Sequence, residues 1–326
     1  MVIGKKRTKS GITLSAVVAC YRDGQAIPIM YRRLKAVFKA LKVDFEIVFV
    51  NDGSPDDSKM VLAKITAADP RVMAVNHSRN FGSQSAFTSG MMVANGDAVV
   101  LLDGDLQDPP ELIPKLFKKW QAGFDVVYGI RVKRVASPFM QWAYKAFYRI
   151  FRATSYIPMP LDAGDFSLLD KKVVQALNSL PESNRFIRGL RSWVGFRQTG
   201  VPYKRPERMF GQTTNSLMKN LWWAQKAIFS FSYLPIELVT ATAFVVMVLT
   251  FGLLVMQLVI RIFWPELTPS GLTTLISLVL FLGGMQLFGL GIIGAYIAHI
   301  HEESKRRPPF IVESFFRKEK RNKSKS

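Results

Sequence analysis

LLDGDLQDPP, residues 101–110, joins the end of a buried strand to the start of a helix. The apolar run that ends at Leu102 predicts a short strand buried on both faces, and the two prolines suit the first helical turn, where a missing N–H is no loss. The carboxylates of Asp103 and Asp105 therefore come at the carboxyl end of a core strand, where open α/β sheets bind ligands. Two such oxygen donors suit Mg²⁺ or Mn²⁺ shared with substrate phosphates.

The same Asp-Gly-Asp sequence also occurs in ordinary solvated turns, because Asp, Gly and Pro all favour turn conformations. Taken alone, two aspartates around a glycine are better interpreted as such a turn. The arrangement of the surrounding chain favours a ligand site instead.

From residue 12 to about 130, strand-like and helix-like segments alternate. Short apolar runs predict the strands, and apolar residues three and four apart predict the helices between them. The strands are expected at 12–20, 45–50, 72–75, 98–102 and 126–128, and the helices at 25–41, 55–68, 84–94 and 110–121. This alternation predicts an α/β fold with a largely parallel sheet covered by helices on both faces. No Gly-x-Gly-x-x-Gly follows the first strand, so a dinucleotide-binding fingerprint is absent.

The composition is strongly basic, with a net charge of +20 over 326 residues. Such a charge can indicate nucleic-acid binding, but much of it lies near two long apolar segments, where basic residues meet anionic lipid. We therefore expect no nucleic-acid partner. The single cysteine, Cys20, cannot form a disulfide within the chain, which agrees with a reducing compartment. Only a short strand-like run follows the basic residues 1–11, so we expect no signal peptide.

Two apolar segments, Leu234–Ile260 and Gly271–Ile300, each exceed the roughly 20 residues that span a bilayer. Two buried soluble helices of this length in succession would be unusual, so we predict a domain of two transmembrane helices over residues 234–300. Residues 305–326 carry nine Lys or Arg against two Glu, whereas the loop 261–270 is formally neutral. By the positive-inside rule, the tail and the preceding domain are cytoplasmic, in a multi-pass protein of the inner (plasma) membrane.

The segments that flank the two spans carry predictions of their own. Residues 212–233 combine apolar residues at helical spacing with Trp222 and Trp223, as amphipathic helices at a membrane interface do; a core helix of the soluble domain is the alternative. The basic tail, residues 301–326, is expected to be cytoplasmic and, beyond Phe310, mobile at the membrane surface. Small residues four or five apart in the second span permit close helix contacts, which is compatible with a homo-oligomer.

Four short motifs occur in a characteristic order: NDGS at 51–54, SRNFG at 78–82, DGDLQDPP at 103–110 and DAGDF at 162–166. Together with the two C-terminal spans, this ordered set resembles the family 2 glycosyltransferases of the polyprenyl-phosphate type. The sequence is similar to dolichol-phosphate mannose synthases and closer to bactoprenol glucosyltransferases, from about residue 12 to residue 309. The resemblance implies that residues 1–211 form a cytoplasmic catalytic domain with the Rossmann-like GT-A fold.

The resemblance implies a binding site for a nucleotide-sugar donor. Asp52 corresponds to a family position that hydrogen-bonds uracil, and Asp23 stands where many relatives have Glu. Asp103 and Asp105 would hold Mg²⁺ or Mn²⁺ on the donor diphosphate, so Asp103 is expected to bind both the metal and the nucleotide-sugar. The metal would act as a Lewis acid, neutralising charge as the nucleoside diphosphate leaves.

The acceptor in this family is a polyprenyl phosphate, whose ionised phosphate needs little help from a general base. Arg131 aligns with a family arginine that is placed to bind that phosphate. Arg205 and Arg208 fall where relatives have a segment that closes over the donor. Asp165 is the candidate catalytic carboxylate, with Asp162 second. Either could act as a base, orient an arginine or orient the sugar, and a plain turn is the remaining alternative.

The resemblance thus implies metal-dependent, inverting transfer of a single hexose, glucose from UDP-glucose, to polyprenyl (undecaprenyl) phosphate at the cytoplasmic membrane face. The expected partners are the UDP-sugar, the polyprenyl phosphate and membrane lipids. Alternatives are transfer of mannose or an aminosugar to the same lipid, and a non-catalytic membrane scaffold or flippase partner. A scaffold would not require the two aspartates, and its spans should contain ionisable residues, of which these spans are nearly free. A processive polysaccharide synthase is disfavoured, because the Gln-x-x-Arg-Trp motif of those enzymes is absent.

Overall fold

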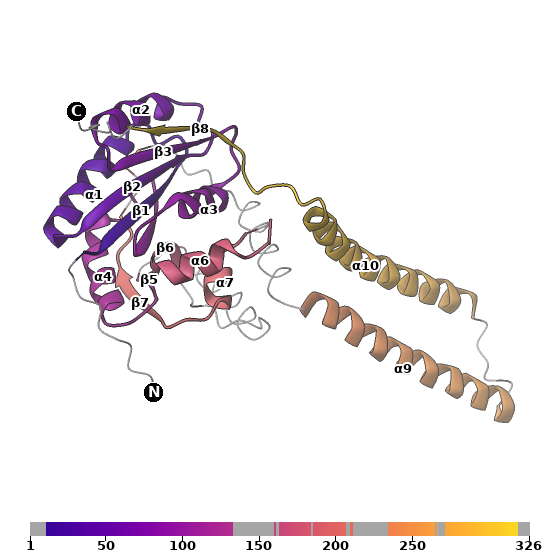
Figure 1. Ribbon diagram of the computed structural model, residues 1–326. Coiled ribbons are helices and arrows are strands. Elements are labelled where there is room, and N and C mark those ends of the chain that lie inside the picture. Colours follow the sequence, from indigo (N-terminus) through magenta and orange to yellow (C-terminus); the bar gives the residue numbers. More distant parts are fainter. Residues whose placement is uncertain are drawn as a thin grey trace, which may run out of the picture. The chain divides into compact units, whose positions relative to one another are not determined.

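The computed structural model describes residues 11–132, 160, 163–183, 185–206, 209–210, 234–264, 266 and 271–318 (Figure 1). These residues fall into two compact units. The globular unit contains the described residues up to 210 together with 307–318, and the helical unit contains 234–306. We describe each unit separately. The predicted amphipathic segment 212–233 lies outside the described residues.

The globular unit is built on an eight-stranded sheet with strand order β7-β5-β6-β4-β1-β2-β3-β8. In chain order the strands are β1 Thr13–Cys20, β2 Asp44–Asn51, β3 Val72–His77, β4 Ala98–Asp103, β5 Val126–Arg131, β6 Ala163–Asp170, β7 Gln198–Tyr203 and β8 Val312–Arg317. Strands β4, β1, β2 and β3 are parallel. Strand β6 runs antiparallel between β4 and β5, and β7 is parallel to β5. The carboxyl ends of β4, β5 and β7 and the amino end of β6 therefore share one edge of the sheet.

Helices cover both faces of this sheet (Figure 1). They are α1 Ile27–Leu41, α2 Ser58–Ala68, α3 Ser83–Val93, the short 3₁₀ helix η1 Pro110–Leu112, α4 Ile113–Gln121, α6 Lys171–Asn178 and α7 Ile187–Trp193. Leu14 and Val18 of β1 join the main apolar core with Phe38 of α1. Val17 points the other way, toward α3, where Gly90 lies so close that a Cβ would overlap the valine. Burial on both faces explains why the parallel strands are continuous apolar runs.

The structure confirms the predicted strands and helices between residues 12 and 131, with ends that differ by a few residues. It adds β6 and β7, which were not predicted. The first residues of β6 have turn-like composition, and β7 contains Gly200 and Pro202. Pro202 is accommodated because β7 is an edge strand that pairs only with β5.

The C-terminal tail differs most from expectation, because residues 312–317 are a strand of the sheet and the prediction of a mobile segment is wrong for them. Strand β8 pairs antiparallel with β3. Its side chains alternate, with Phe316 packed against the core and Phe315 exposed. The positive charge of the tail hid this alternation, which is typical of a half-buried strand. The ion pair between Lys59 Nζ and Glu313 Oε2, at 2.9 Å, adds a contact from α2 to β8.

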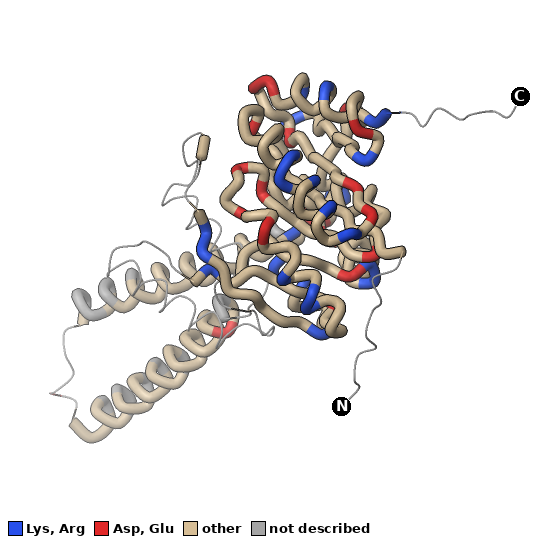
Figure 2. The backbone as a smooth tube through the Cα atoms, turned by 90° about the vertical axis from the view of Figure 1, so that its left-hand side faces the viewer, with Lys and Arg blue, Asp and Glu red and all other residues tan. Residues whose placement is uncertain are grey.

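The helical unit contains two long apolar helices, α9 Leu234–Phe263 and α10 Leu272–Ser304. Within them, Ile236–Leu253 and Phe281–Ser304 have mean hydropathies of 2.1 and 1.6. Large apolar side chains such as Phe251 and Phe288 are exposed, and charged residues are few along both helices (Figure 2). By length and composition both helices can cross a membrane.

A buried carboxylate, Asp69, gives the globular unit a pH-dependent contribution to stability through its contacts with three neighbouring side chains. The Asp69 carboxylate accepts hydrogen bonds from Tyr31 Oη at 2.9 Å, from Lys35 Nζ at 3.2 Å and from Arg71 Nη2 at 2.8 Å. The Arg71 hydrogen bonds are the largest cause of a pKa of Asp69 far below its usual range, and they outweigh the effect of burial. A lowered pKa stabilises the fold above the unfolded pKa of about 4, and this stabilisation is lost as pH falls.

We expect Asp69→Asn to lower the free energy of unfolding by about 1–3 kcal/mol at pH 7, because Arg71 and Lys35 lose a charged acceptor. The measurement is thermal or denaturant unfolding of both proteins at pH 7 and pH 3. The difference between them should be clearly smaller at pH 3, because Asp69 of the unfolded chain is then mostly protonated while Asp69 of the folded protein is still ionised. An equal difference at both pH values would contradict this assignment.

Candidate active site

Carboxylates gather where β4 ends. Asp103 is the last residue of β4, and Asp105 and Asp108 follow in the connection to η1. Burial is the main cause that raises the pKa of Asp103 well above its usual range, followed by repulsion from Asp108, Asp105 and Asp165, while Arg205 acts in the opposite direction. Asp108 is buried, and Asp103 and Asp105 are half-buried, so this acidic cluster needs a compensating cation.

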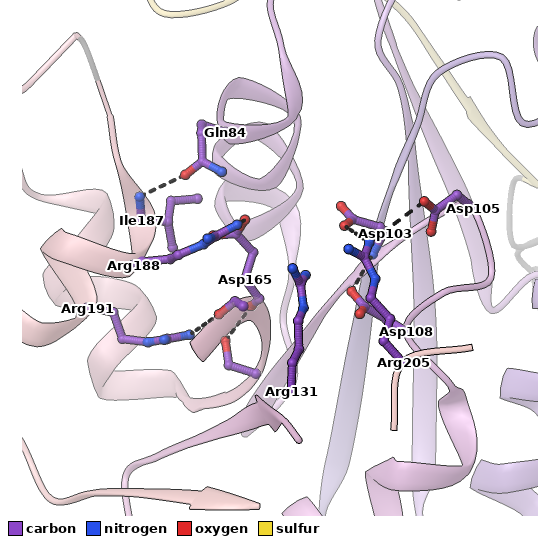
Figure 3. A network of polar contacts seen from close by, with 12 residues as sticks. Gln84, Asp103, Asp105, Asp108, Arg131, Asp165, Ile187, Arg188, Arg191 and Arg205 are labelled. Atoms are coloured by element: carbon purple, nitrogen blue, oxygen red, sulfur yellow. Dashed lines mark hydrogen bonds and ion pairs between the residues drawn. The ribbon is translucent and has the colours of Figure 1, made fainter. Parts of the chain in front are cut away.

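The geometry of Asp103 and Asp105 fits a shared cation. An Oδ2 atom of each lies near the same guanidinium nitrogen, Arg205 Nη2, at 3.8 Å and 3.9 Å respectively (Figure 3). Among the residues that the structure describes, no group of three or more His, Cys, Asp or Glu side chains could hold a metal. Two carboxylates are a small ligand set, which suits Mg²⁺ or Mn²⁺ when water and a diphosphate supply the other oxygens.

A second chain of polar contacts leads from these acids to Arg131. The Tyr203 hydroxyl donates to Asp108 Oδ1 at 2.9 Å, and Arg131 Nε donates to the Tyr203 oxygen at 3.4 Å. Burial, and next the charge of Asp108, raise the pKa of Tyr203 far above its usual range, so the hydroxyl keeps its proton. Tyr203 therefore links the acidic cluster to Arg131, whose guanidinium lies between that cluster and Asp165 (Figure 3).

Asp165 of β6 is paired with an arginine of α7. Its two carboxylate oxygens accept from Arg188 Nε at 3.0 Å and Nη2 at 2.7 Å, in a bidentate pair. Burial acts to raise the pKa of Asp165, but Arg188, with help from Arg191 and Arg131, holds that pKa below its usual range. An ionised carboxylate in this pairing is a weak proton acceptor and a good support for a guanidinium.

Arg191 supports the same region from within the protein. It is fully buried, its Nη1 donates to the Gly164 carbonyl at 3.3 Å, and its guanidinium lies 5.1 Å from the centre of the Tyr128 ring. Burial lowers the pKa of Arg191 to about 10. A Cβ at Gly164 would lie 3.0 Å from Arg131 Nη2, so the glycine allows Arg131 to approach β6. Both arginines thus pack against the backbone at residue 164.

Asp52 and Asp23 lie at the carboxyl ends of β2 and β1, as expected. Asp52 is 3% exposed and accepts backbone hydrogen bonds from Phe81 at 2.9 Å and from Gly82 at 2.7 Å. Asp23 Oδ2 accepts from the backbone N–H of Tyr21 at 2.9 Å. Both carboxylates therefore shape the loops at this edge of the sheet.

The structure brings most of the predicted site residues to one edge of the sheet. Asp23, Asp52, Asp103, Asp105, Arg131, Asp165 and Arg205 all lie there. Asp162 and Arg208 lie outside the described residues. Asp108 and Tyr203 had no predicted role, and only the position of Asp108 at the start of a helix, inside a motif, could have drawn attention to it.

The chain is similar to known proteins along most of its length. The family model described as "Glycosyl transferase family 2" matches residues 15–177. The chain is 41% identical over 306 residues to an uncharacterized glycosyltransferase of Bacillus subtilis, YkcC, with 94% of each chain covered. It is 35% identical over 305 residues to a prophage bactoprenol glucosyl transferase homolog of Escherichia coli, with 92% of this chain and 98% of that protein covered. The solved structure of glucosyl-3-phosphoglycerate synthase from Mycobacterium tuberculosis with UDP aligns at 17% identity over 68% of this chain and 79% of that one, with a TM-score of 0.46.

The sheet and its acidic edge define a GT-A, Rossmann-like enzyme fold, followed in this chain by two apolar helices that can cross a membrane. The chain belongs to glycosyl transferase family 2 and is a glycosyltransferase. This confirms the predicted family, the predicted fold class and the prediction that the protein is an enzyme.

Proposed function

We propose that this protein transfers a single hexose, glucose from UDP-glucose, to polyprenyl phosphate at the cytoplasmic face of the membrane, with inversion at the sugar. The observation that carries the proposal is the division of the site into an acidic and a basic half. Asp103 and Asp105 converge on one cation position, while Arg131 and Arg188 stand on the other side, toward Asp165 (Figure 3). The first half suits a metal-bound diphosphate and the second suits a phosphate.

The acidic half would hold the donor. Asp103 and Asp105 would bind Mg²⁺ or Mn²⁺, which supplies charge neutralisation for the departing nucleoside diphosphate. Arg205 already lies within 4 Å of both carboxylates, at 3.8 Å and 3.9 Å, and would move from them to the diphosphate when the donor binds. Arg208 would assist from the same segment, and Asp23 and Asp52 would position the nucleoside.

The basic half would hold the acceptor. Arginine binds phosphate through two parallel hydrogen bonds, and both candidate arginines are held in place, Arg131 by Tyr203 and Arg188 by Asp165. A lipid phosphate is mostly a dianion at neutral pH, since its second pKa is about 6. Its oxygen can attack C1 of the sugar as the bond from C1 to the diphosphate oxygen breaks. Attack opposite the leaving group inverts C1.

The pairing of Asp165 with Arg188 favours, among the three roles that the sequence left open, the role of orienting an arginine. The acceptor oxygen carries no proton that a base would need to remove. The bidentate pair with Arg188 occupies both Asp165 oxygens. Positioning and charge stabilisation would therefore supply the rate enhancement.

The proposed setting is a multi-pass protein of the inner membrane, with α9 and α10 as the spans and the globular unit in the cytoplasm. The length and hydropathy of both helices support spanning, and the basic charge near their ends supports this orientation. The name bactoprenol glucosyl transferase, carried by relatives such as that of Shigella phage SfV at 35% identity, supports a lipid-phosphate acceptor and glucose. Mannose or an aminosugar on the same lipid is the alternative.

The direct test incubates purified protein with polyprenyl phosphate, Mn²⁺ or Mg²⁺, and a panel of labelled UDP- and GDP-sugars, and counts label in the organic phase. We expect label from one donor, UDP-glucose, and loss of that label with EDTA. Asp105→Asn should reduce transfer by about 100-fold or more, because the metal ion that binds the diphosphate loses a protein ligand. No labelled lipid from any donor, with folded protein and intact lipid, would refute the transferase assignment and favour a scaffold.

A second prediction concerns Asp165. We expect Asp165→Asn to lower kcat/KM for the acceptor by about 10- to 100-fold, because Arg188 loses its bidentate support. The basic and acidic limbs of the pH–rate profile should stay where they are. A profile that loses a limb in the variant would instead identify Asp165 as the general base.

A further inference from the structure

The C-terminal strand begins beside the carboxyl end of β3. In the antiparallel pairing, Val312 of β8 lies opposite His77, the last residue of β3. The backbone N–H of Ser78 donates to the Ile311 carbonyl at 3.0 Å. Just before it, the Phe310 ring stacks on the His77 ring, with centroids 5.2 Å apart and planes 10° apart. The chain that leaves α10 therefore contacts the loop that follows β3.

His77 is the centre of a buried polar cluster. It is 2% exposed, its Nδ1 lies 2.8 Å from Asp52 Oδ1, and its Nε2 lies 2.8 Å from Ser89 Oγ. Phe81 contacts the ring edge to face, at a centroid distance of 5.7 Å. With both nitrogens in hydrogen-bond contact, the imidazole must keep one orientation, and the stacked Phe310 ring covers a face of it.

Asp52 passes this constraint on to the loop 78–82. The same Oδ1 atom that contacts His77 accepts from the Phe81 N–H at 2.9 Å, and Oδ2 accepts from the Gly82 N–H at 2.7 Å. Gly53, with φ of +59°, packs so closely on the backbone of Arg79 that any side chain would overlap it. The turn after β2 and the loop after β3 therefore form one packed structure.

Two further contacts hold β8 in this position. Asn76 Nδ2 donates to Ser314 Oγ at 3.2 Å, and Asn76 Oδ1 accepts from Asn51 Nδ2 at 3.1 Å. Lys59 Nζ reaches both carboxylate oxygens of Glu313 at 2.9 Å. Side-chain contacts thus run from β8 through β3 to the last residue of β2, next to Asp52.

We propose that the C-terminal segment 310–317 supports the residues of the donor-nucleotide site from behind, and that Phe310 is a positioning residue for this site. Phe310 fixes His77, His77 fixes Asp52, and Asp52 fixes the loop 78–82 at the carboxyl ends of β2 and β3, where open α/β sheets bind ligands. This inference rests on the proposed function, because it takes the bound nucleotide to be that of the sugar donor. The segment after the second membrane-length helix would thus complete the site that the N-terminal half begins.

The test measures UDP affinity of the full-length protein by calorimetry in detergent with Mn²⁺, together with KM for donor and for polyprenyl phosphate. We expect Phe310→Leu to weaken UDP binding and raise the donor KM by about 3- to 10-fold, since an aromatic contact is lost. The acceptor KM and the melting temperature should change little. Phe310→Tyr keeps the stacked ring and should therefore have the UDP affinity and donor KM of the wild-type protein. His77→Gln should show the same donor-specific loss as Phe310→Leu.

The matched control is Phe315→Leu, on the same strand but 56% exposed, which should leave UDP affinity unchanged. If wild-type protein binds UDP and Phe310→Leu binds it equally well, the inference is overturned and the proposed function stands. Equal losses for donor and acceptor with a lowered melting temperature would make Phe310 merely structural and also overturn it. No UDP binding or transfer by the wild-type protein would refute the proposed function itself.

Discussion

Repulsion among buried and half-buried carboxylates at the end of β4 is the constraint on which the site depends. Asp103, Asp105 and Asp108 come within six residues of one another, and Asp165 of β6 adds a fourth negative charge to their field. Such a group is tolerated only with nearby cations. Arg205 and Arg131 provide this compensation, and Arg188 pairs with Asp165. The proposed ligands, a metal-bound diphosphate and a phosphate, would supply what each half of this arrangement lacks.

The sheet topology makes this arrangement possible. An antiparallel β6 between β4 and β5 places Asp165 at the same edge as Asp103 and Arg131, although these residues come from separate parts of the chain. Strand β7 then brings Tyr203 to Asp108 across 95 residues of sequence. The acidic half of the candidate site is built mainly from the first four strands, and the basic half from β5, β6 and α7. Strand β8 adds the far edge, beyond β3.

The sequence predicted the parts of the fold whose signal is local. Apolar runs such as 98–102 are unmistakable because parallel strands are buried on both faces, and the aspartates after them mark the ligand edge. Strand β6 was not predicted, since Ala163-Gly164-Asp165 resembles a turn and becomes a strand only through pairing with β4 and β5. Strand β8 was mistaken for a mobile tail because its neighbours are basic. Its partner β3 is more than 230 residues earlier in the chain, as the 238-residue separation of Asn76 and Ser314 shows.

The site residues follow the same rule. Asp103, Asp105, Asp165 and Arg131 were predicted from motif order, but the partners that define their chemistry were not. The pair of Asp165 with Arg188 spans 23 residues and depends on how α7 packs beside β6. That pair changes the interpretation of Asp165, because a carboxylate engaged with a guanidinium suits positioning better than proton transfer. The motifs therefore predicted the candidate site, and the contacts in the structure are the basis for the proposed role of Asp165.

The proposed function requires that Asp103 and Asp105 hold a divalent cation together with the donor diphosphate. Its most direct test is electron paramagnetic resonance of Mn²⁺, in which the signal of the free ion falls as the ion binds. We predict weak binding to the protein alone, much tighter binding when UDP is added, and loss of that gain in Asp103→Asn and Asp105→Asn. Binding that is independent of UDP, or that persists in both variants, would refute this shared site for the cation and the diphosphate.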